Sequence, residues 1–245
     1  MEPRYDKIGR GYAGFRRPDP RIAAAINAQL GDARSILNIG AGSGSYEPMG
    51  RELVAVEPSS VMIAQRASAA PVIQACAEAL PFADGRFDCS MALLSIHHWS
   101  NIELGLLEAI RVTRDRLVLF TWLGFDRHFW LFDYLPAIRA IDEEIFPKEE
   151  WLRVRLGKID ILPVSIPHDC VDGFMGAYWR RPSAYLDAGV RRAISTFSRL
   201  GNIDSALVRL QEDLASGEWR RRYGELMRES SFDLGYRLVV LHKDR

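Results

Sequence analysis

A glycine-rich turn and a carboxylate that follows it are the residues best suited to bind a ligand. Gly40, Gly42 and Gly44 come after a short apolar run, and Glu57 ends the next apolar run along the chain. Glycine lets the backbone turn tightly and approach a ligand where a Cβ would clash. An acid at the end of the second strand of such a unit accepts hydrogen bonds from ribose hydroxyls. The pattern therefore predicts a turn that binds a nucleoside.

Two common phosphate-binding motifs do not fit this turn. A dinucleotide fingerprint requires glycine or alanine at position 45, where this chain has Ser45. No Gly-Lys-Ser/Thr sequence follows, and residues 35–50 contain neither Lys nor Arg. We therefore expect a ligand without a phosphate group. Ser45 and the lack of a second mononucleotide-binding half also argue against an NAD-dependent oxidoreductase.

His97 and His98 are the candidate catalytic residues. They follow an apolar run over residues 88–95, at the end of the expected fourth strand. Ligands of open α/β sheets bind beyond the carboxyl ends of the strands, and a histidine there can act as a base near neutral pH. The alternative is that one histidine packs in the core while the other caps a turn. Adjacent side chains point apart, so we expect no metal site from this pair.

The composition limits the class of protein. The 245 residues are 48% hydrophobic and 26% charged, and the formal net charge is +0. A nucleic-acid partner usually requires a basic face, so we expect none. Cys76, Cys89 and Cys170 form no CxxC pair, and no apolar run approaches the ~20 residues of a membrane span. The N-terminus lacks the apolar core of a signal peptide, so we expect a cytoplasmic protein that binds no membrane.

The spacing of apolar residues predicts alternating strands and helices that position these groups. Asp19 is expected to cap a helix over residues 20–30, and Ser59 or Ser60 to cap a second. Residues 100–103, Ser-Asn-Ile-Glu, form a capping box that would begin a third. This alternation predicts a doubly wound, mostly parallel α/β sheet. The expected strands cover residues 36–39, 53–56, 72–75, 88–95, 117–122, 161–166 and 236–241.

Several segments, taken together, resemble the class I S-adenosylmethionine-dependent methyltransferases. They are LNIGAGSG at residues 37–44, the acid Glu57, and CAEALPF at residues 76–82 followed by Phe87 and Asp88. The histidine pair is similar to that of small-molecule enzymes related to the quinone-biosynthesis methyltransferases, and differs from the [DN]-P-P-[YF] of DNA amino-methyltransferases. The resemblance implies a Rossmann-like, seven-stranded sheet, S-adenosylmethionine as cofactor and S-adenosylhomocysteine as product.

The resemblance also assigns parts of the cofactor to residues of this chain. The glycine loop would hold the methionine end and Glu57 the ribose. Ala77 and Glu78 would contact the adenine edge, with Pro58 and Met62 against its face. Ordinary helix–sheet packing is the alternative for Met62. The predicted cofactor-binding residues are Tyr5, Tyr12, Arg17, Asn38, Gly40, Ala41, Gly42, Gly44, Glu57, Pro58, Met62, Ala77, Glu78, Leu94 and Ser95.

Two positions depart from the family pattern. Asn38 stands where the family usually has Asp, which removes a negative charge close to the cofactor's ammonium group. Cys76 stands where the family often has Asp. Because a thiol is a weak acceptor, we expect the adenine contact there to be weaker or carried by the backbone.

The N-terminal segment is expected to form a lid over the ligand. In the resembling family a Tyr-Asp…Tyr segment packs near the cofactor, and Tyr5, Asp6 and Tyr12 match it. Arg16 or Arg17 would pair with the carboxylate of the methionine moiety, and we assign this role to Arg17. A mobile leader is the alternative.

The chain is expected to form a single domain. The resemblance implies one methyltransferase domain over residues 1–245, with an antiparallel last strand between strands five and six. We divide it into a lid (1–18), a cofactor-binding core (19–122), an aromatic insertion with the sixth strand (123–170), a helical cap (171–232) and the last strand (233–245). Apolar spacing predicts cap helices over 186–197 and 207–214. Residues in this part of the chain and at strand ends are expected to contact the substrate: Trp99, Trp122, Phe174, Tyr178, Trp179 and Arg180. For any single aromatic residue among them, packing in the core is the alternative.

Methyl transfer to a small molecule is the leading hypothesis for function. A sulfonium already makes its methyl group electrophilic, so a visible catalytic constellation is not required. The alternatives are an enzyme that uses the same cofactor as a cyclase, a lyase or for aminocarboxypropyl transfer, and a non-catalytic cofactor-binding protein. S-adenosylhomocysteine as product would indicate methyl transfer, and methylthioadenosine would indicate cleavage at another carbon. A monomer and a homodimer are both compatible with the sequence.

Overall fold

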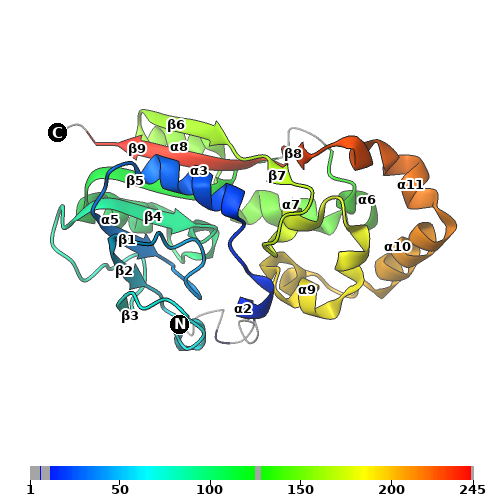
Figure 1. The fold of residues 1–245 in the computed structure, drawn as a ribbon, viewed down its shortest axis with the longest axis horizontal. Coiled ribbons are helices and arrows are strands. Elements are labelled where there is room, and N and C mark those ends of the chain that lie inside the picture. The colour runs from blue at the N-terminus through cyan, green and yellow to red at the C-terminus, as the bar shows by residue number, and fades with distance from the viewer. Residues whose placement is uncertain (1–5, 7–11, 125–127, 244–245) are drawn as a thin grey trace.

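The computed structural model describes residue 6, residues 12–124 and residues 128–243. Its main sheet has the strand order β3-β2-β1-β4-β5-β9-β6 (Figure 1). The strands pair in parallel except at β9, which runs antiparallel between β5 and β6. This confirms the predicted fold class, including the antiparallel last strand. The strands are β1 (Ser35–Ile39), β2 (Glu52–Val56), β3 (Val72–Ile73), β4 (Phe87–Leu93), β5 (Thr113–Trp122), β6 (Ile159–Pro163) and β9 (Tyr236–His242).

Helices cover both faces of this sheet. The apolar stripe of α3 (Pro20–Leu30) joins the buried cluster that contains Met91. On the opposite face, α5 (Ile102–Val112) and α8 (Glu149–Leu156) join the cluster that contains Ala92. Met91 and Ala92 are neighbours in β4, and successive side chains of a strand point to opposite faces. The sheet is therefore buried on both sides, as expected for near-continuous apolar strands.

The helix starts differ in how well the sequence indicates them. Asp19 accepts a hydrogen bond from the Arg21 amide at 3.0 Å and caps α3, as predicted. At α5 the predicted capping box is wrong. Asn101 is the cap and accepts from the Leu104 amide at 3.0 Å. The Ser100 hydroxyl instead donates to the Glu78 carboxylate at 2.8 Å, because the loop after β3 lies beside it.

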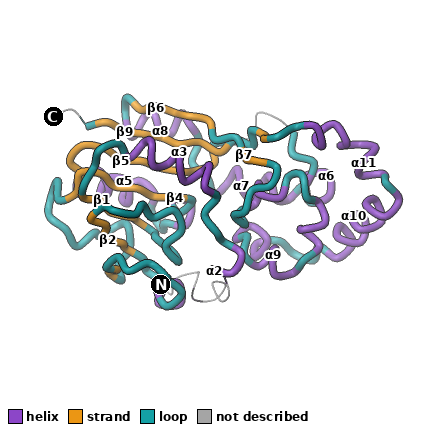
Figure 2. The backbone as a smooth tube through the Cα atoms, in the orientation of Figure 1, coloured by secondary structure: helices purple, strands orange, loops and turns teal. Residues whose placement is uncertain are grey.

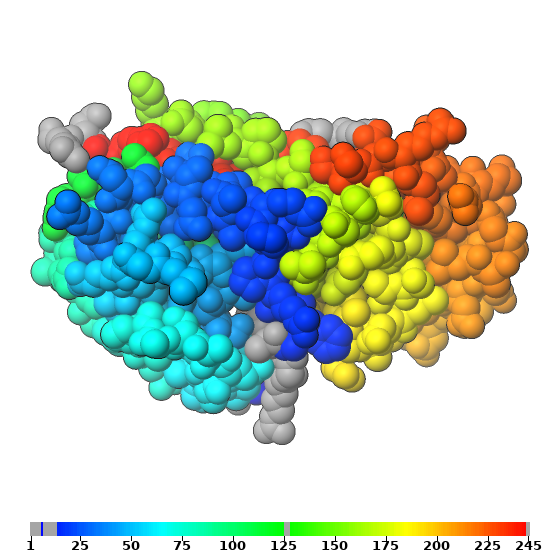
Figure 3. Space-filling view, in the orientation of Figure 1, coloured from blue at the N-terminus to red at the C-terminus, as the bar shows by residue number. Residues whose placement is uncertain are grey.

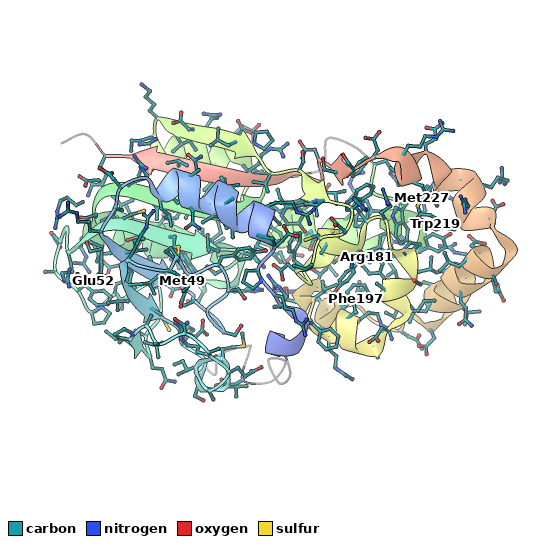
Figure 4. All side chains as sticks on the ribbon, viewed as in Figure 1. Met49, Glu52, Arg181, Phe197, Trp219 and Met227 are labelled. Carbon is teal, nitrogen blue, oxygen red and sulfur yellow. The ribbon has the colours of Figure 1, made fainter. Side chains whose placement is uncertain are left out.

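A second, mostly helical lobe lies beside the carboxyl ends of the parallel strands (Figures 1 and 2). Within it the Trp130 indole donates to the Trp179 carbonyl at 2.7 Å and meets the Trp219 ring edge-on. Figure 4 labels Trp219 in this lobe. This aromatic centre explains the many aromatic residues of the insertion and cap. The lobe contains α6 (Leu131–Tyr134), α7 (Ala137–Ile145), α9 (Ala188–Arg192), α10 (Asp204–Ser216), α11 (Glu218–Tyr223), and the pair β7 (Ile166–Pro167) and β8 (Ser231–Phe232).

Two expected elements of this lobe are interrupted. The sixth strand ends at Pro163, and the residues from 166 pair with β8 instead. The helix expected over 186–197 is broken into η3 (Pro182–Leu186), α9 and η4 (Ser195–Arg199). The break occurs because the Asp187 carboxylate accepts from the backbone amides that follow it and begins a new helix there. The helix expected over 207–214 is confirmed as α10.

The N-terminal segment connects the two lobes. In the space-filling view the blue residues that follow α2 (Tyr12–Phe15) run between the sheet and the yellow cap segment (Figure 3). Among the helices of the described residues, none has the length and apolar character needed to span a bilayer.

Candidate functional site

A cavity of about 420 Å³ lies at the carboxyl ends of the parallel strands. It collects residues from the turns after β1, β2, β3 and β4, which are far apart in sequence and meet at one edge of the sheet. The predicted cofactor-binding residues that it brings together are Asn38, Gly40, Ala41, Gly42, Glu57, Pro58, Met62, Ala77, Glu78, Leu94 and Ser95.

The glycine turn after β1 is shaped by close backbone approach. Gly40 has a φ of 68°, and its amide donates to the Val56 carbonyl at 2.9 Å. A Cβ at Gly40 would lie 2.7 Å from the Cβ of Ser95. Ser95 is itself fixed, because its hydroxyl donates to the Ile39 carbonyl at 3.0 Å. Glycine at position 40 therefore meets both a backbone and a space requirement.

Glu57 is held at the end of β2 by backbone donors. Its carboxylate accepts from the Gly42 amide at 2.8 Å and from the Ser59 amide at 2.9 Å. The residue is only 5% exposed, and this burial raises the pKa of the Glu57 carboxyl although the two hydrogen bonds oppose the rise. Each carboxylate oxygen keeps a second lone pair, so the group can accept further hydrogen bonds from a ligand in the cavity.

A buried ion pair lies behind the glycine turn. Arg66 contacts Glu47 at 2.7 Å, and both side chains are almost fully buried. The Asn38 amide nitrogen donates to the same Glu47 carboxylate at 3.0 Å. Asn38 therefore presents a neutral group to the cavity, and the acid near it is already paired with Arg66.

The residues after β3, which were predicted to contact adenine, are also fixed by hydrogen bonds. Glu78 accepts from the Ser100 hydroxyl at 2.8 Å and from the Asn101 amide at 3.0 Å. Burial acts to raise the pKa of Glu78, but these hydrogen bonds outweigh it and the pKa is lowered. The side chain therefore remains an ionised acceptor at the edge of the cavity, which Cys76 also lines.

The N-terminal residues reach the cavity through Arg16, where we had assigned Arg17. Arg16 lines the cavity and pairs with Asp172 at 2.7 Å, with side chains 10% and 0% exposed. Arg17 is exposed and lines no cavity found in the described residues. Asp6 accepts from the Ser59 hydroxyl at 2.5 Å, beside Glu57. Tyr5 and the side chain of Tyr12 lie outside the described residues.

A second cavity of about 50 Å³ adjoins the first. Arg16, Leu94 and His98 line both cavities, whereas His97 lines only the smaller one. The His97 ring stacks on Phe146 with a centroid distance of 4.0 Å. The remaining walls of the small cavity come mainly from the cap and β9: Trp122, Asp142, Phe174, Met175, Ala193, Ile194, Ser195, Thr196 and Tyr236.

The structure separates the six residues that we expected to contact substrate. Trp122 and Phe174 line the smaller cavity, and Trp99 lines the larger one. The other three line neither cavity. Trp179 is fully buried with its indole donating to the Ile166 carbonyl, Tyr178 is buried, and Arg180 donates to the Glu229 carbonyl. Of the predicted cofactor-binding residues, Gly44 also lies outside the larger cavity.

Sequence reasoning missed Asp142 and Tyr236. Asp142 lies one helical turn after the buried Ile138 in α7, so an acid on an apolar helix face was the available signal. Tyr236 begins β9, and nothing in its local sequence distinguishes it from an ordinary strand residue. The sequence offers both Arg16 and Arg17 as candidates, and only the tertiary partner Asp172 distinguishes Arg16.

Comparison with known proteins identifies the family. A family model described as a methyltransferase domain matches residues 37–120, which contain the glycine turn and Glu57. A solved structure from Anabaena variabilis, provisionally described as a methyltransferase from an antibiotic biosynthesis pathway, is 33% identical to the chain with a TM-score of 0.86. The match covers 93% of this chain and 98% of that one. The chain belongs to the class I S-adenosylmethionine-dependent methyltransferases.

This methyltransferase shares its fold with more distant structures. The YcgJ protein of Bacillus subtilis is 17% identical with a TM-score of 0.54, over 92% of this chain and 99% of that one. The (4+2)-cyclase SpnF is 16% identical with a TM-score of 0.54, over 98% and 93%. No curated protein sequence matches the chain. Membership of the family implies S-adenosylmethionine as the cofactor of this methyltransferase.

Proposed function

We propose that this methyltransferase transfers the methyl group to a small molecule that enters the second cavity. The wall shared by the two cavities carries the proposal, because Leu94 and His98 face both. A cofactor in the larger cavity would turn its reacting end toward an acceptor in the smaller one. At about 50 Å³, the smaller cavity has room only for a compact group.

The residues of the larger cavity fit S-adenosylmethionine. Glu57 offers a fixed carboxylate to the ribose hydroxyls, and Gly40 leaves the space that a Cβ would fill. Arg66, behind the glycine turn, is already paired with Glu47, so the turn offers no cation to a phosphate. Arg16 lies at the shared wall, where its guanidinium, although paired with Asp172, would meet the carboxylate of the methionine moiety.

The proposed chemistry places modest demands on the protein. When bound, the cofactor supplies an electrophilic methyl group, whose bond to sulfur breaks as its bond to the acceptor forms. The residues around Leu94 must hold the acceptor in line with that bond and exclude water. His98 lies on the same wall, where its imidazole can take a proton from an acceptor that carries one.

Glu57→Ala tests the assignment of the ribose site. We expect the variant to bind S-adenosylhomocysteine more weakly by roughly 1–3 kcal/mol, because charged hydrogen bonds to the ribose are lost. Isothermal titration calorimetry measures this affinity directly. Unchanged affinity would refute the ribose assignment.

Glu52→Ala is the matched control for that experiment. Glu52 begins the same strand, is exposed and pairs with Arg86 at 2.8 Å. Figure 4 shows it at the end of the sheet remote from the cap. Its removal should leave the affinity for S-adenosylhomocysteine unchanged, so an equal loss in both variants would point to a general effect on the sheet.

His98→Ala tests the proposed base. We expect turnover to fall on the order of a hundredfold or more while the affinity for S-adenosylmethionine is retained. His97→Ala is the comparison, because His97 lines only the smaller cavity and should change the KM for the acceptor more than kcat. Turnover and its pH profile are followed by release of S-adenosylhomocysteine. An unaltered rate in His98→Ala rules out the base role.

Another use of the cofactor is the competing proposal. The fold is shared with SpnF, which is described as a cyclase, so the fold alone does not fix the reaction. Analysis of the products of S-adenosylmethionine separates the two proposals. We expect S-adenosylhomocysteine, and methylthioadenosine in its place would contradict methyl transfer.

A further inference from the structure

Asp142 is a buried acid in the smaller cavity. It lies on α7, is 4% exposed, and its Oδ1 accepts from the Thr196 hydroxyl at 2.7 Å. Within the described part of the chain, its Oδ2 has no hydrogen-bond partner and Asp142 forms no ion pair. A buried carboxylate is costly unless it is paired, so a ligand that brings a positive charge would satisfy it.

The charged groups of the described chain near Asp142 do not pair with its carboxylate. Burial raises the pKa of Asp142 to about 7, and the hydrogen bond from Thr196 and the charge of Arg199 offset only part of the rise. Arg16, at the junction of the two cavities, is paired with Asp172 at 2.7 Å. His97 and His98, on the η1 helix (Ile96–His98), line the same cavity.

Aromatic rings form much of the remaining wall. Trp122, Phe146, Phe174 and Tyr236 all line the cavity that Asp142 lines. Trp122 meets Phe146 edge-on at 5.4 Å, and Phe174 meets Tyr236 at 4.8 Å, so the rings hold one another in place. Aromatic faces attract cations as well as apolar groups. A carboxylate among aromatic rings is a setting that favours an ammonium group over a neutral hydroxyl.

We propose that the acceptor carries a protonated amine and that Asp142, held by Thr196, selects it. This inference rests on the proposed function and names the substrate class. Asp142 and Thr196 line only the smaller cavity, whereas Leu94 and His98 line both. The amine is therefore an anchor remote from the cofactor, and the atom that receives the methyl group is a different one, near the shared wall.

Binding of matched amines and alcohols tests the proposal. The probes are ethylamine with ethanol, propylamine with propanol, and butylamine with butanol, chosen as compact groups for a cavity of about 50 Å³. Each is titrated calorimetrically into protein saturated with S-adenosylhomocysteine. We expect at least one amine to bind about tenfold or more tightly than its alcohol partner. If no amine in the panel binds better than its partner, the proposal is wrong.

Variants then assign the preference to Asp142. Asp142→Asn keeps the shape and an acceptor for Thr196 but removes the charge, so the amine preference should disappear. Glu143→Gln is the control, because this exposed neighbour on α7 faces Arg139 and not the cavity. Persistence of the preference in Asp142→Asn would overturn the assignment. Thermal melting curves establish that each variant is folded.

Titration of S-adenosylhomocysteine alone distinguishes failure of the proposed function from failure of the proposed amine anchor. Failure of the wild-type protein to bind S-adenosylhomocysteine would refute the proposed function. Binding of S-adenosylhomocysteine without any amine preference would refute only the amine anchor.

Discussion

Replacement of Arg16 by alanine is expected to destabilise the protein by roughly 3 kcal/mol, because it leaves Asp172 buried without its counter-charge. The Arg16 Nε lies 2.7 Å from Asp172 Oδ1, and the Asp172 side chain is 0% exposed. The Tyr46 hydroxyl and the Gly173 amide also donate to Asp172. We therefore expect a loss at the lower end of the ~3–5 kcal/mol that breaking a buried ion pair typically costs. Urea unfolding of the variant and the wild-type protein measures the difference.

Arg17→Ala is the matched control for Arg16. Arg17 is the next residue, of the same type, and exposed, so its removal should change the free energy of unfolding by less than ~0.5 kcal/mol. The double variant Arg16→Ala/Asp172→Asn should be more stable than the sum of the two single variants implies, because the uncompensated charge is gone. Equal losses in Arg16→Ala and Arg17→Ala would contradict the buried pair.

Asp142→Asn is expected to remove a large part of the pH dependence of stability. The pKa of Asp142 is raised from its ordinary 3.8 to about 7 in the folded protein, mainly by burial. A raised folded-state pKa means that the folded state holds the proton more tightly than the unfolded state. Stability from this group is therefore present below about pH 4 and is lost as the pH rises toward 7. The loss amounts to roughly 4 kcal/mol.

The measurement compares urea unfolding of the variant and the wild-type protein at several pH values. Between pH 4 and pH 7, the wild-type protein should lose stability relative to Asp142→Asn, because asparagine does not titrate. All other residues are the same in the two proteins, so the difference isolates the contribution of position 142. A constant difference across this range would contradict a buried acid that is protonated near neutral pH.

Most residues of the larger cavity could be predicted because they lie close to one another in short stretches of sequence. The glycine turn, Glu57 and the Ala77–Glu78 pair each follow a strand, and strands of a parallel sheet end at one edge. Short apolar runs located these strands, and only their ends moved in the structure. The turn residues could therefore be predicted from residue type and position alone.

The smaller cavity, where we propose that the acceptor binds, could not be predicted because its residues meet only in the tertiary structure. Asp142, Thr196 and Tyr236 come from α7, η4 and β9, and no local pattern connects them. Aromatic residue type was also a poor guide. Trp179 resembled a ligand contact, but its indole is satisfied by the Ile166 carbonyl inside the cap core.

The crystal structure of the complex with S-adenosylhomocysteine is the most direct test of the account. It should show the ribose hydroxyls within hydrogen-bonding distance of Glu57, the adenine beside Met62, and the sulfur turned toward the wall formed by Leu94 and His98. S-adenosylhomocysteine bound elsewhere, or bound in the larger cavity with no contact to Glu57, would contradict it.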